Sequence, residues 1–167
     1  LSASMDGKPA ARQEIAVTSD RYVQTELFLR HDETLEGFRL WRPVDPALYD
    51  LRIETLEDGA IADQVDTYFG MRKIEIIRGC VTLNNSPLYQ RLVLDQGYWP
   101  DGLLTAPSDD ALRRDVELTL AMGYNGARKH QKFEDPRYLY WADKLGLLVW
   151  GELPSAYWLR DSQKRNM

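Results

Sequence analysis

The spacing of apolar residues divides the chain into two parts with different periods. Up to about residue 83, apolar and polar side chains alternate, as in residues 51–55, where Leu, Ile and Thr alternate with Arg and Glu. Turn-forming residues at 57–59 separate this run from a second one at 64–68, which predicts a hairpin. With further short runs at 74–76 and 80–83, the pattern is typical of an antiparallel sheet.

From residue 88 onward the period changes. Residues 88–94 form a nearly continuous apolar run, which predicts a buried strand, whereas residues 109–122 carry apolar side chains at helical spacing. Residues 126–128 and 147–150 predict two more buried strands, and a second helix is expected between them.

Capping residues mark the ends of both expected helices. Ser108 precedes the first helix and Asp135 the second, and Gly123 and Gly146 follow their last turns. The order strand, helix, strand, helix, strand predicts parallel pairing, in either an open doubly wound sheet or a barrel. Residues 95–100 are bulky and aromatic where a dinucleotide-binding sheet needs glycines, so the barrel is favoured.

Composition and charge exclude several classes of function. A net charge of −5 without a basic block disfavours nucleic acid as a partner. The single cysteine, Cys80, excludes a disulfide within the chain and a multi-cysteine metal site, and neither a metal nor a cofactor is expected.

The apolar runs are also too short for a membrane span. None approaches the ~20 residues that cross a bilayer, so we expect a soluble segment. The first residues lack the features of a signal peptide. Because the chain begins without Met, we expect it to start within a longer protein, whose compartment stays open.

Five stretches, in order and at matching intervals, resemble glycoside hydrolase family 2, the group of β-galactosidases, β-glucuronidases and β-mannosidases. The stretches and the family patterns that they resemble are residues 40–49 (LWRP to PALY; LWsPexPxLY), 68–72 (YFGMR; FGxR), 83–87 (LNNSP; LNGKP), 123–128 (GYNGAR; GfNxvR) and 142–149 (ADKLGLLV; cDxxGllV).

The resemblance implies a fold in two parts. Residues 1–83 correspond to the C-terminal part of an immunoglobulin-like β-sandwich domain. Residues 84–167 correspond to the N-terminal part of a TIM (β/α)8 barrel, the catalytic domain, with its first three strands. Where the better known members read RxSHYP, residues 128–133 read RKHQKF. This departure indicates a divergent subgroup, so the sugar specificity of the named activities is not carried over.

The resemblance also implies a retaining glycosidase that acts on β-linked sugars. Such enzymes need two carboxyl groups about 5–5.5 Å apart. Family members place these glutamates after the fourth and seventh barrel strands, the first directly following an asparagine. The sequence contains no Asn-Glu pair, so we expect both glutamates beyond Met167 and no hydrolysis by this segment alone. Glu152, after the third strand, is a disfavoured candidate for the acid.

Residues that follow the ends of barrel strands are expected to face the substrate. The resemblance implies that Arg128, which ends the second strand, supports the nucleophilic carboxylate. The alternative is a structural ion pair with Glu152, which is itself a candidate for binding a sugar hydroxyl. His130 and Lys132 are candidates for binding hydroxyls or a carboxylate of the sugar, and the alternative is a solvated loop in which Lys132 and Glu134 are exposed.

The first strand offers an acidic and an aromatic candidate. Asp95 ends this strand, and Trp99 with Tyr98 beside it can form a sugar-stacking platform, although packing is an equal alternative. Trp41, Tyr49 and Tyr68 are expected in the core of the first part.

The expected partners are a carbohydrate substrate and the rest of the parent chain. Two rival functions stay open. One is a non-catalytic carbohydrate-binding or scaffold protein that retains the fold. The other is an unrelated α/β hydrolase, whose Gly-x-Ser-x-Gly elbow the sequence lacks.

Overall fold

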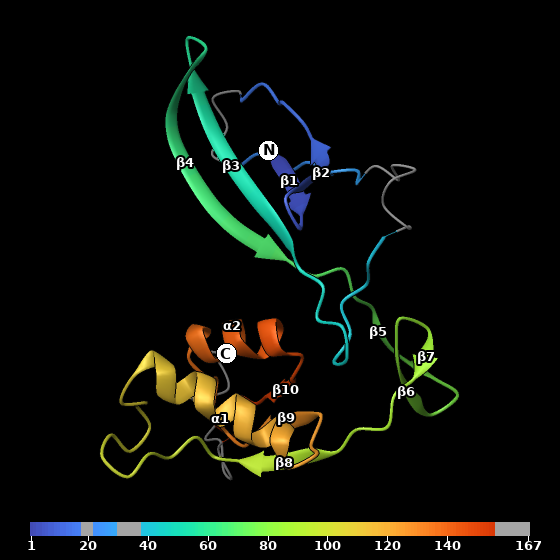
Figure 1. Ribbon diagram of the computed structural model, residues 1–167, viewed down its shortest axis with the longest axis vertical. Coiled ribbons are helices and arrows are strands. Elements are labelled where there is room, and N and C mark those ends of the chain that lie inside the picture. The colour runs from blue at the N-terminus through green and yellow to red at the C-terminus, as the bar shows by residue number, and fades with distance from the viewer. Residues whose placement is uncertain (18–21, 30–37, 156–167) are drawn as a thin grey trace, which may run out of the picture. The chain divides into compact units, whose positions relative to one another are not determined.

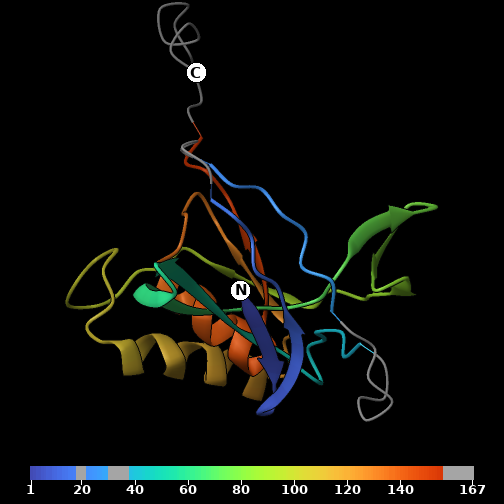
Figure 2. The ribbon, with the colours of Figure 1, turned by 90° about the horizontal axis from the view of Figure 1, so that it is seen from above.

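The computed structural model describes residues 1–17, 22–29 and 38–155, and the chain divides into two compact units, Leu1–Leu88 and Tyr89–Met167. The first unit is antiparallel. A four-stranded sheet has the order β2-β1-β3-β4, and a smaller three-stranded sheet has the order β5-β6-β7 (Figures 1 and 2). The strands are β1 (Ser2–Met5), β2 (Lys8–Arg12), β3 (Tyr49–Glu57), β4 (Ala60–Phe69), β5 (Ile74–Ile77), β6 (Cys80–Leu83) and β7 (Ser86–Pro87).

In this unit, two-residue turns connect the paired strands that follow one another in the chain. The hairpin predicted around residue 58 is confirmed, because β3 pairs antiparallel with β4. Its turn residues, Asp58 and Gly59, both have positive φ angles of 51° and 81°, as a type I′ turn requires. The turns after β1, β5 and β6 likewise have positive φ at both central residues: Asp6 and Gly7, Arg78 and Gly79, and Asn84 and Asn85.

Aromatic residues fill the interior of the first unit, as predicted. Trp41 is fully buried, Tyr49 is buried and stacks on Phe69 with ring centroids 5.2 Å apart, and Tyr68 is half-buried. The Asn84 side chain donates to the Trp41 carbonyl oxygen at 3.1 Å, so the turn after β6 is tied to the tryptophan backbone.

The second unit is a parallel sheet covered by two helices. Its elements are β8 (Leu92–Asp95), α1 (Asp109–Ala121), β9 (Gly126–Lys129), α2 (Pro136–Leu145) and β10 (Leu148–Gly151). The three strands pair parallel in the order β10-β9-β8, which confirms the predicted pairing. Figure 1 shows α1 and α2 side by side over the sheet.

Both helices begin and end at the predicted residues. The Ser108 hydroxyl accepts from the Ala111 amide, and the Asp135 carboxylate accepts from the Arg137 amide. Gly123 and Gly146 have φ angles of 87° and 86° just past the helices.

The first parallel strand is shorter than predicted, because β8 begins at Leu92 rather than at Leu88. Asn125, which lies just before β9, holds the residues that precede β8. The Asn125 amide donates to the Tyr89 carbonyl oxygen at 2.8 Å and accepts from the Arg91 amide at 2.7 Å.

The two faces of the parallel sheet differ in their covering. Ala127 of β9 is fully buried within the helix-side core, which includes Leu112, Val116, Tyr138 and Leu147. On the other face, Leu94, Arg128 and Trp150 lie in register on neighbouring strands and are exposed. Leu94 keeps 60% and Trp150 keeps 50% of its accessible surface. The second unit therefore has one packed face and one open face, on which Arg128 lies between two exposed apolar side chains.

Candidate functional site

The candidate site lies at the carboxyl-end edge of the parallel sheet. Asp95, Lys129 and Gly151 are the last residues of β8, β9 and β10 and lie opposite one another in the ladder. Because the strands are parallel, their carboxyl ends and the loops that follow meet at one edge. The edge therefore brings together the candidates that follow the three strands.

Arg128 and Glu152 form an ion pair on the open face. The guanidinium Nε of Arg128 donates to Glu152 Oε1, and the Gln131 amide donates to Glu152 Oε2 at 3.2 Å. The hydrogen bond from Arg128, assisted by that from Gln131, lowers the pKa of the Glu152 carboxyl below its ordinary value. A glutamate held ionised in this way is poorly suited to act as a general acid.

His130 continues the chain from β9 and contacts the loop after β8. Its amide donates to the Asp95 carbonyl oxygen at 2.8 Å, and its ring Nδ1 lies 3.2 Å from Nε2 of Gln96. The imidazole is thus held beside an amide side chain at the same edge, within the group of polar residues that includes Arg128.

Asp95 turns its carboxylate toward the protein and not toward an open surface. Oδ1 accepts from the Gly97 amide at 2.6 Å, and Oδ2 accepts from the ammonium of Lys129. The carboxylate therefore shapes the loop after β8 and balances a buried charge.

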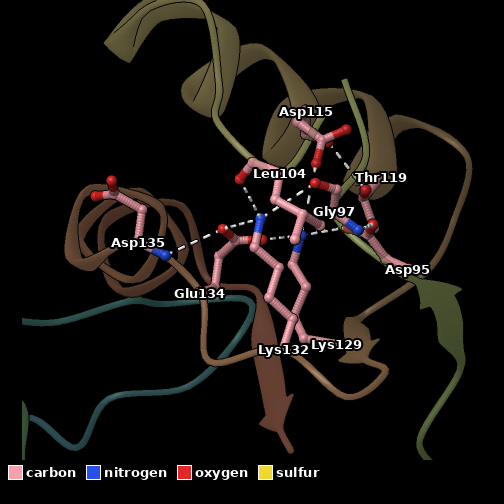
Figure 3. Close-up of polar contacts among 9 residues, drawn as sticks. All are labelled: Asp95, Gly97, Leu104, Asp115, Thr119, Lys129, Lys132, Glu134 and Asp135. Atoms are coloured by element: carbon pink, nitrogen blue, oxygen red, sulfur yellow. Dashed lines mark hydrogen bonds and ion pairs between the residues drawn. The ribbon is translucent and has the colours of Figure 1, made fainter. Parts of the chain in front are cut away.

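Lys129 is the centre of a buried network of charges (Figure 3). Its side chain is 1% exposed, and the ammonium lies 2.9 Å from Glu134 Oε2 and 4.0 Å from Asp115 Oδ2, in addition to its bond to Asp95. It also lies 3.8 Å from the ring centroid of Tyr138. The network joins strands β8 and β9 to both helices.

Two carboxyl groups of this network, those of Asp115 and Glu134, have pKa values shifted in opposite directions. Burial raises the pKa of the Asp115 carboxyl, and attraction to Lys129 only partly offsets this. Burial also opposes ionisation of Glu134, but hydrogen bonds from Lys132, Lys129 and the Asp135 backbone amide, together with the attraction of Lys129, outweigh it, so the pKa of that carboxyl is lowered. Glu134 is thus the ionised partner of two lysines.

Lys132 and Glu134 are largely buried, so the alternative of a solvated loop in which both are exposed is wrong. The side chain of Lys132 is 14% exposed and that of Glu134 is 4% exposed. The Lys132 ammonium contacts Glu134 Oε1 at 2.9 Å and donates to the carbonyl oxygens of Gly97 at 3.1 Å and Leu104 at 3.0 Å. Lys132 therefore connects the loops that follow β8 and β9.

Trp99 and Tyr98 have different environments in the loop after β8. Trp99 is half-buried and packs against the helix-side core, which favours packing as its role. Tyr98 is 66% exposed. Of the two rings, Tyr98 is the one available to a ligand.

The described residues contain no group of three or more His, Cys, Asp or Glu side chains arranged to hold a metal ion. Among the same residues, no helix has the length and apolar character needed to cross a membrane. The chemistry present at the edge is that of paired ions, an imidazole and an exposed phenol. Such groups bind and orient hydroxyls and carboxylates.

Known proteins similar to this chain are glycosidases. Residues 3–72 match the model of the glycosyl hydrolases family 2. A β-galactosidase of Vibrio cholerae is 32% identical over 149 residues, which are 86% of this chain and 14% of that protein. A β-glucuronidase of Streptococcus agalactiae is 28% identical over 123 residues, which are 72% of this chain and 20% of that protein.

A solved structure of a glycosyl hydrolase family 2 member from Bacteroides cellulosilyticus shares the fold. Its TM-score is 0.78 at 24% identity, over 91% of this chain and 21% of that chain. The chain belongs to glycosyl hydrolase family 2. It spans about 14% and 20% of the length of the two family 2 relatives named above.

Among the described residues of this family 2 chain, sequence reasoning missed the most buried charged one. Lys129, between Arg128 and His130, was not predicted to belong to the site, and neither were Gln96, Gln131 and Glu134. Strand alternation held a usable signal, because Lys129 shares the face of Ala127, two residues earlier. A lysine at a position that faces the helices needs buried carboxylates, and Asp95, Asp115 and Glu134 supply them.

Proposed function

We propose that this family 2 chain is part of a retaining glycosidase, the parent protein, that hydrolyses O-glycosidic bonds of β-linked sugars. The names of its relatives, β-galactosidase and β-glucuronidase, support glycosidase chemistry. Net retention requires one carboxyl group as the acid and a second as the nucleophile. We propose that both lie in the parent protein outside residues 1–167 and that this segment alone does not hydrolyse glycosides.

The proposed architecture is that expected for the family. Residues 1–83 would be the C-terminal part of an immunoglobulin-like β-sandwich, and residues 84–167 the N-terminal part of a TIM barrel with its first three strands. The division into compact units at Leu88 and Tyr89 supports a boundary in this stretch. The parallel sheet, with helices on one face and an open face that carries exposed Leu94 and Trp150, supports a barrel wall.

The observation that carries the proposal is the ion pair of Arg128 and Glu152 at the carboxyl-end edge of the sheet. In barrels, this edge carries the catalytic and binding residues. A guanidinium has five donor hydrogens, and the bond from Nε to Glu152 uses one of them. Donors therefore remain for a second carboxylate, the nucleophile, which Arg128 would keep ionised and oriented.

We assign supporting roles to the other residues of the edge. His130, held beside Gln96, would bind a sugar hydroxyl. Glu152 would fix Arg128 rather than serve as the acid, because its lowered pKa opposes proton donation. Asp95 would act through the loop that it shapes, and Trp99 through packing.

The test is an assay of the full-length parent protein. We expect turnover of a 4-nitrophenyl β-glycoside, with the first-formed sugar seen by NMR as the β-anomer, and no turnover by residues 1–167 alone. An α-anomer as the first product would overturn net retention. Sugar binding without turnover on a panel of β-glycosides would instead identify a non-catalytic carbohydrate-binding protein.

A further inference from the structure

The ammonium of Lys132 has all of its donor hydrogens in use. An ammonium group carries three N–H donors and no acceptor. The structure gives Nζ three acceptors: the carbonyl oxygens of Gly97 at 3.1 Å and Leu104 at 3.0 Å, and Glu134 Oε1 at 2.9 Å. Lys132 therefore has no donor left for a sugar hydroxyl or carboxylate, although it lies at the edge where the substrate is proposed to bind.

The two carbonyl groups that Lys132 holds are the ends of one loop. Between them, the backbones of Trp99 and Leu103 exchange hydrogen bonds at 2.6 Å and 3.1 Å, which closes a narrow turn. Lys132 joins the two stems of this turn at a single nitrogen, as Figure 3 shows for Gly97 and Leu104. We call residues 97–104 the clasped loop.

Gly97 fits closely against the lysine. Its φ angle is 67°, which favours glycine, and an added Cβ would lie 2.6 Å from Lys132 Nζ and 2.7 Å from its Cδ. Glu134 Oε2 would lie 2.9 Å from the same Cβ, and the Glu134 side chain is 4% exposed. The close fit of these groups makes the position of the ammonium specific.

The clasped loop presents exposed apolar side chains. Tyr98 is 66% exposed and Leu103 is 71% exposed, while Trp99 beside them packs inward. An exposed phenol ring beside a polar edge can stack on the apolar face of a pyranose or on an aromatic aglycone. The rigidity of that ring depends on what fixes the loop.

We propose that Lys132 is a positioning residue, which closes the clasped loop and thereby holds Tyr98 as the stacking surface for the glycoside. This inference rests on the proposed function for its substrate, and on the contacts of Lys132 for its mechanism. Lys132 acts without touching the sugar, so its loss affects substrate binding through Tyr98 alone.

The first arm of the test measures the loop in the full-length parent protein by hydrogen–deuterium exchange. Lys132→Met keeps the length of the side chain and removes all three donors. We expect faster exchange in peptides that cover residues 97–104, with partial recovery in Lys132→Arg, whose guanidinium can still donate to both carbonyl groups. Lys144→Met, at an exposed lysine of α2, is the matched control and is expected to leave these peptides unchanged.

The second arm measures kinetics on an aryl β-glycoside. We expect Lys132→Met and Tyr98→Ala each to raise KM by up to about tenfold, with a smaller effect on kcat, because one stacked aromatic contact is lost. The double variant is expected to be no worse than either single variant, because a loosened loop already loses the Tyr98 contact. Leu112→Ala, in the core, is expected to lower stability without this KM effect.

Each outcome decides the inference. Unchanged hydrogen–deuterium exchange in Lys132→Met would show that Lys132 does not close the clasped loop. Additive effects of Lys132→Met and Tyr98→Ala on KM would show that Lys132 does not act on substrate binding through Tyr98. If Lys132→Met does not fold, Gly97→Ala disrupts the same contact from the loop side and is read in the same way. A parent protein that hydrolyses no glycoside removes the proposed function and the role of Tyr98, whereas the exchange arm still decides whether Lys132 closes the loop.

Discussion

Arg128 and Lys129 are neighbours in the chain, and the structure gives them opposite environments. Arg128 lies on the open face of the parallel sheet, where its side chain is 47% exposed and pairs with one glutamate. Lys129 lies on the helix-covered face, where it is 1% exposed and contacts Asp95, Glu134 and the ring of Tyr138.

The difference between these residues shows that the two faces of the sheet contribute differently to folding and to recognition. A partly exposed ion pair contributes little to stability, because water screens it and the side chains lose freedom. Removal of one partner from a buried network leaves uncompensated charge and is strongly destabilising. The helix-covered face therefore governs folding, whereas the open face carries charge that is available for recognition.

The largest expected effect is on the covered face. Lys129→Met in the parent protein leaves Asp95 and Glu134 without their shared cation, and we expect a loss of about 3–5 kcal/mol in the free energy of unfolding. Urea denaturation followed by tryptophan fluorescence measures it. Lys144→Met, on the surface of α2, is the matched control and is expected to show a far smaller change. Equal unfolding midpoints for the two variants would contradict the distinction between the faces.

The next effect is on the open face and concerns turnover. Lysine at position 128 keeps the charge but loses the planar fork that holds a carboxylate. We expect Arg128→Lys in the parent protein to lower kcat by about two orders of magnitude, as for the loss of one preorganised electrostatic donor. The melting curve is expected to stay in place. Near wild-type turnover with unchanged melting would make Arg128 a structural residue.

A smaller effect is expected on stability at acid pH, through Glu134, a partner of Lys129. The pKa of Glu134 lies below its ordinary value of 4.5 in the folded protein, so its contribution to stability is complete above 4.5. As the pH falls further, the unfolded chain takes up the proton first, and this contribution is lost through the lowered folded pKa. Glu134→Gln is therefore expected to flatten the loss of stability below pH 4.5, seen as melting temperature against pH. An unchanged slope would remove Glu134 from the acid response.

The smallest effect is expected at Glu152. Its partner Arg128 is half-exposed, so Glu152→Gln in the parent protein is expected to change the melting temperature much less than Lys129→Met does. Differential scanning calorimetry of both variants in one buffer makes the comparison. A shift at Glu152 as large as that at Lys129 would show that the open face also contributes to folding.

Local signals in the sequence were sufficient for most of the fold. The Asp58-Gly59 turn, the caps at Ser108 and Asp135, and Gly146 each fix the backbone within a few residues, so they predict where elements begin and end. Parallel pairing followed from the order of the elements. The start of β8 was missed, because it depends on Asn125, more than thirty residues away in the chain.

The candidate site was only partly predictable. Arg128 and Glu152 were identified as possible partners, since both were placed at the carboxyl ends of parallel strands. The role of Lys132 depends on carbonyl groups 28 and 35 residues earlier in the chain, and backbone carbonyls leave no mark in an amino-acid sequence. Nothing local distinguishes a lysine that binds a loop from one that faces solvent.

The alternation of side chains along strand β9 fixes the faces on which its two charged residues, Arg128 and Lys129, lie. Deletion or insertion of one residue within Gly126–Lys129 reverses the faces of every side chain beyond the change. Such a change before Arg128 would turn its guanidinium toward the helices and place the Lys129 ammonium on the open face. Gly126 adds a second constraint, because an added Cβ would lie 2.5 Å from Leu92 Cδ2 and 2.8 Å from the Leu148 carbonyl oxygen. Length variation in relatives should therefore fall in the loops beside β9 and spare the strand itself.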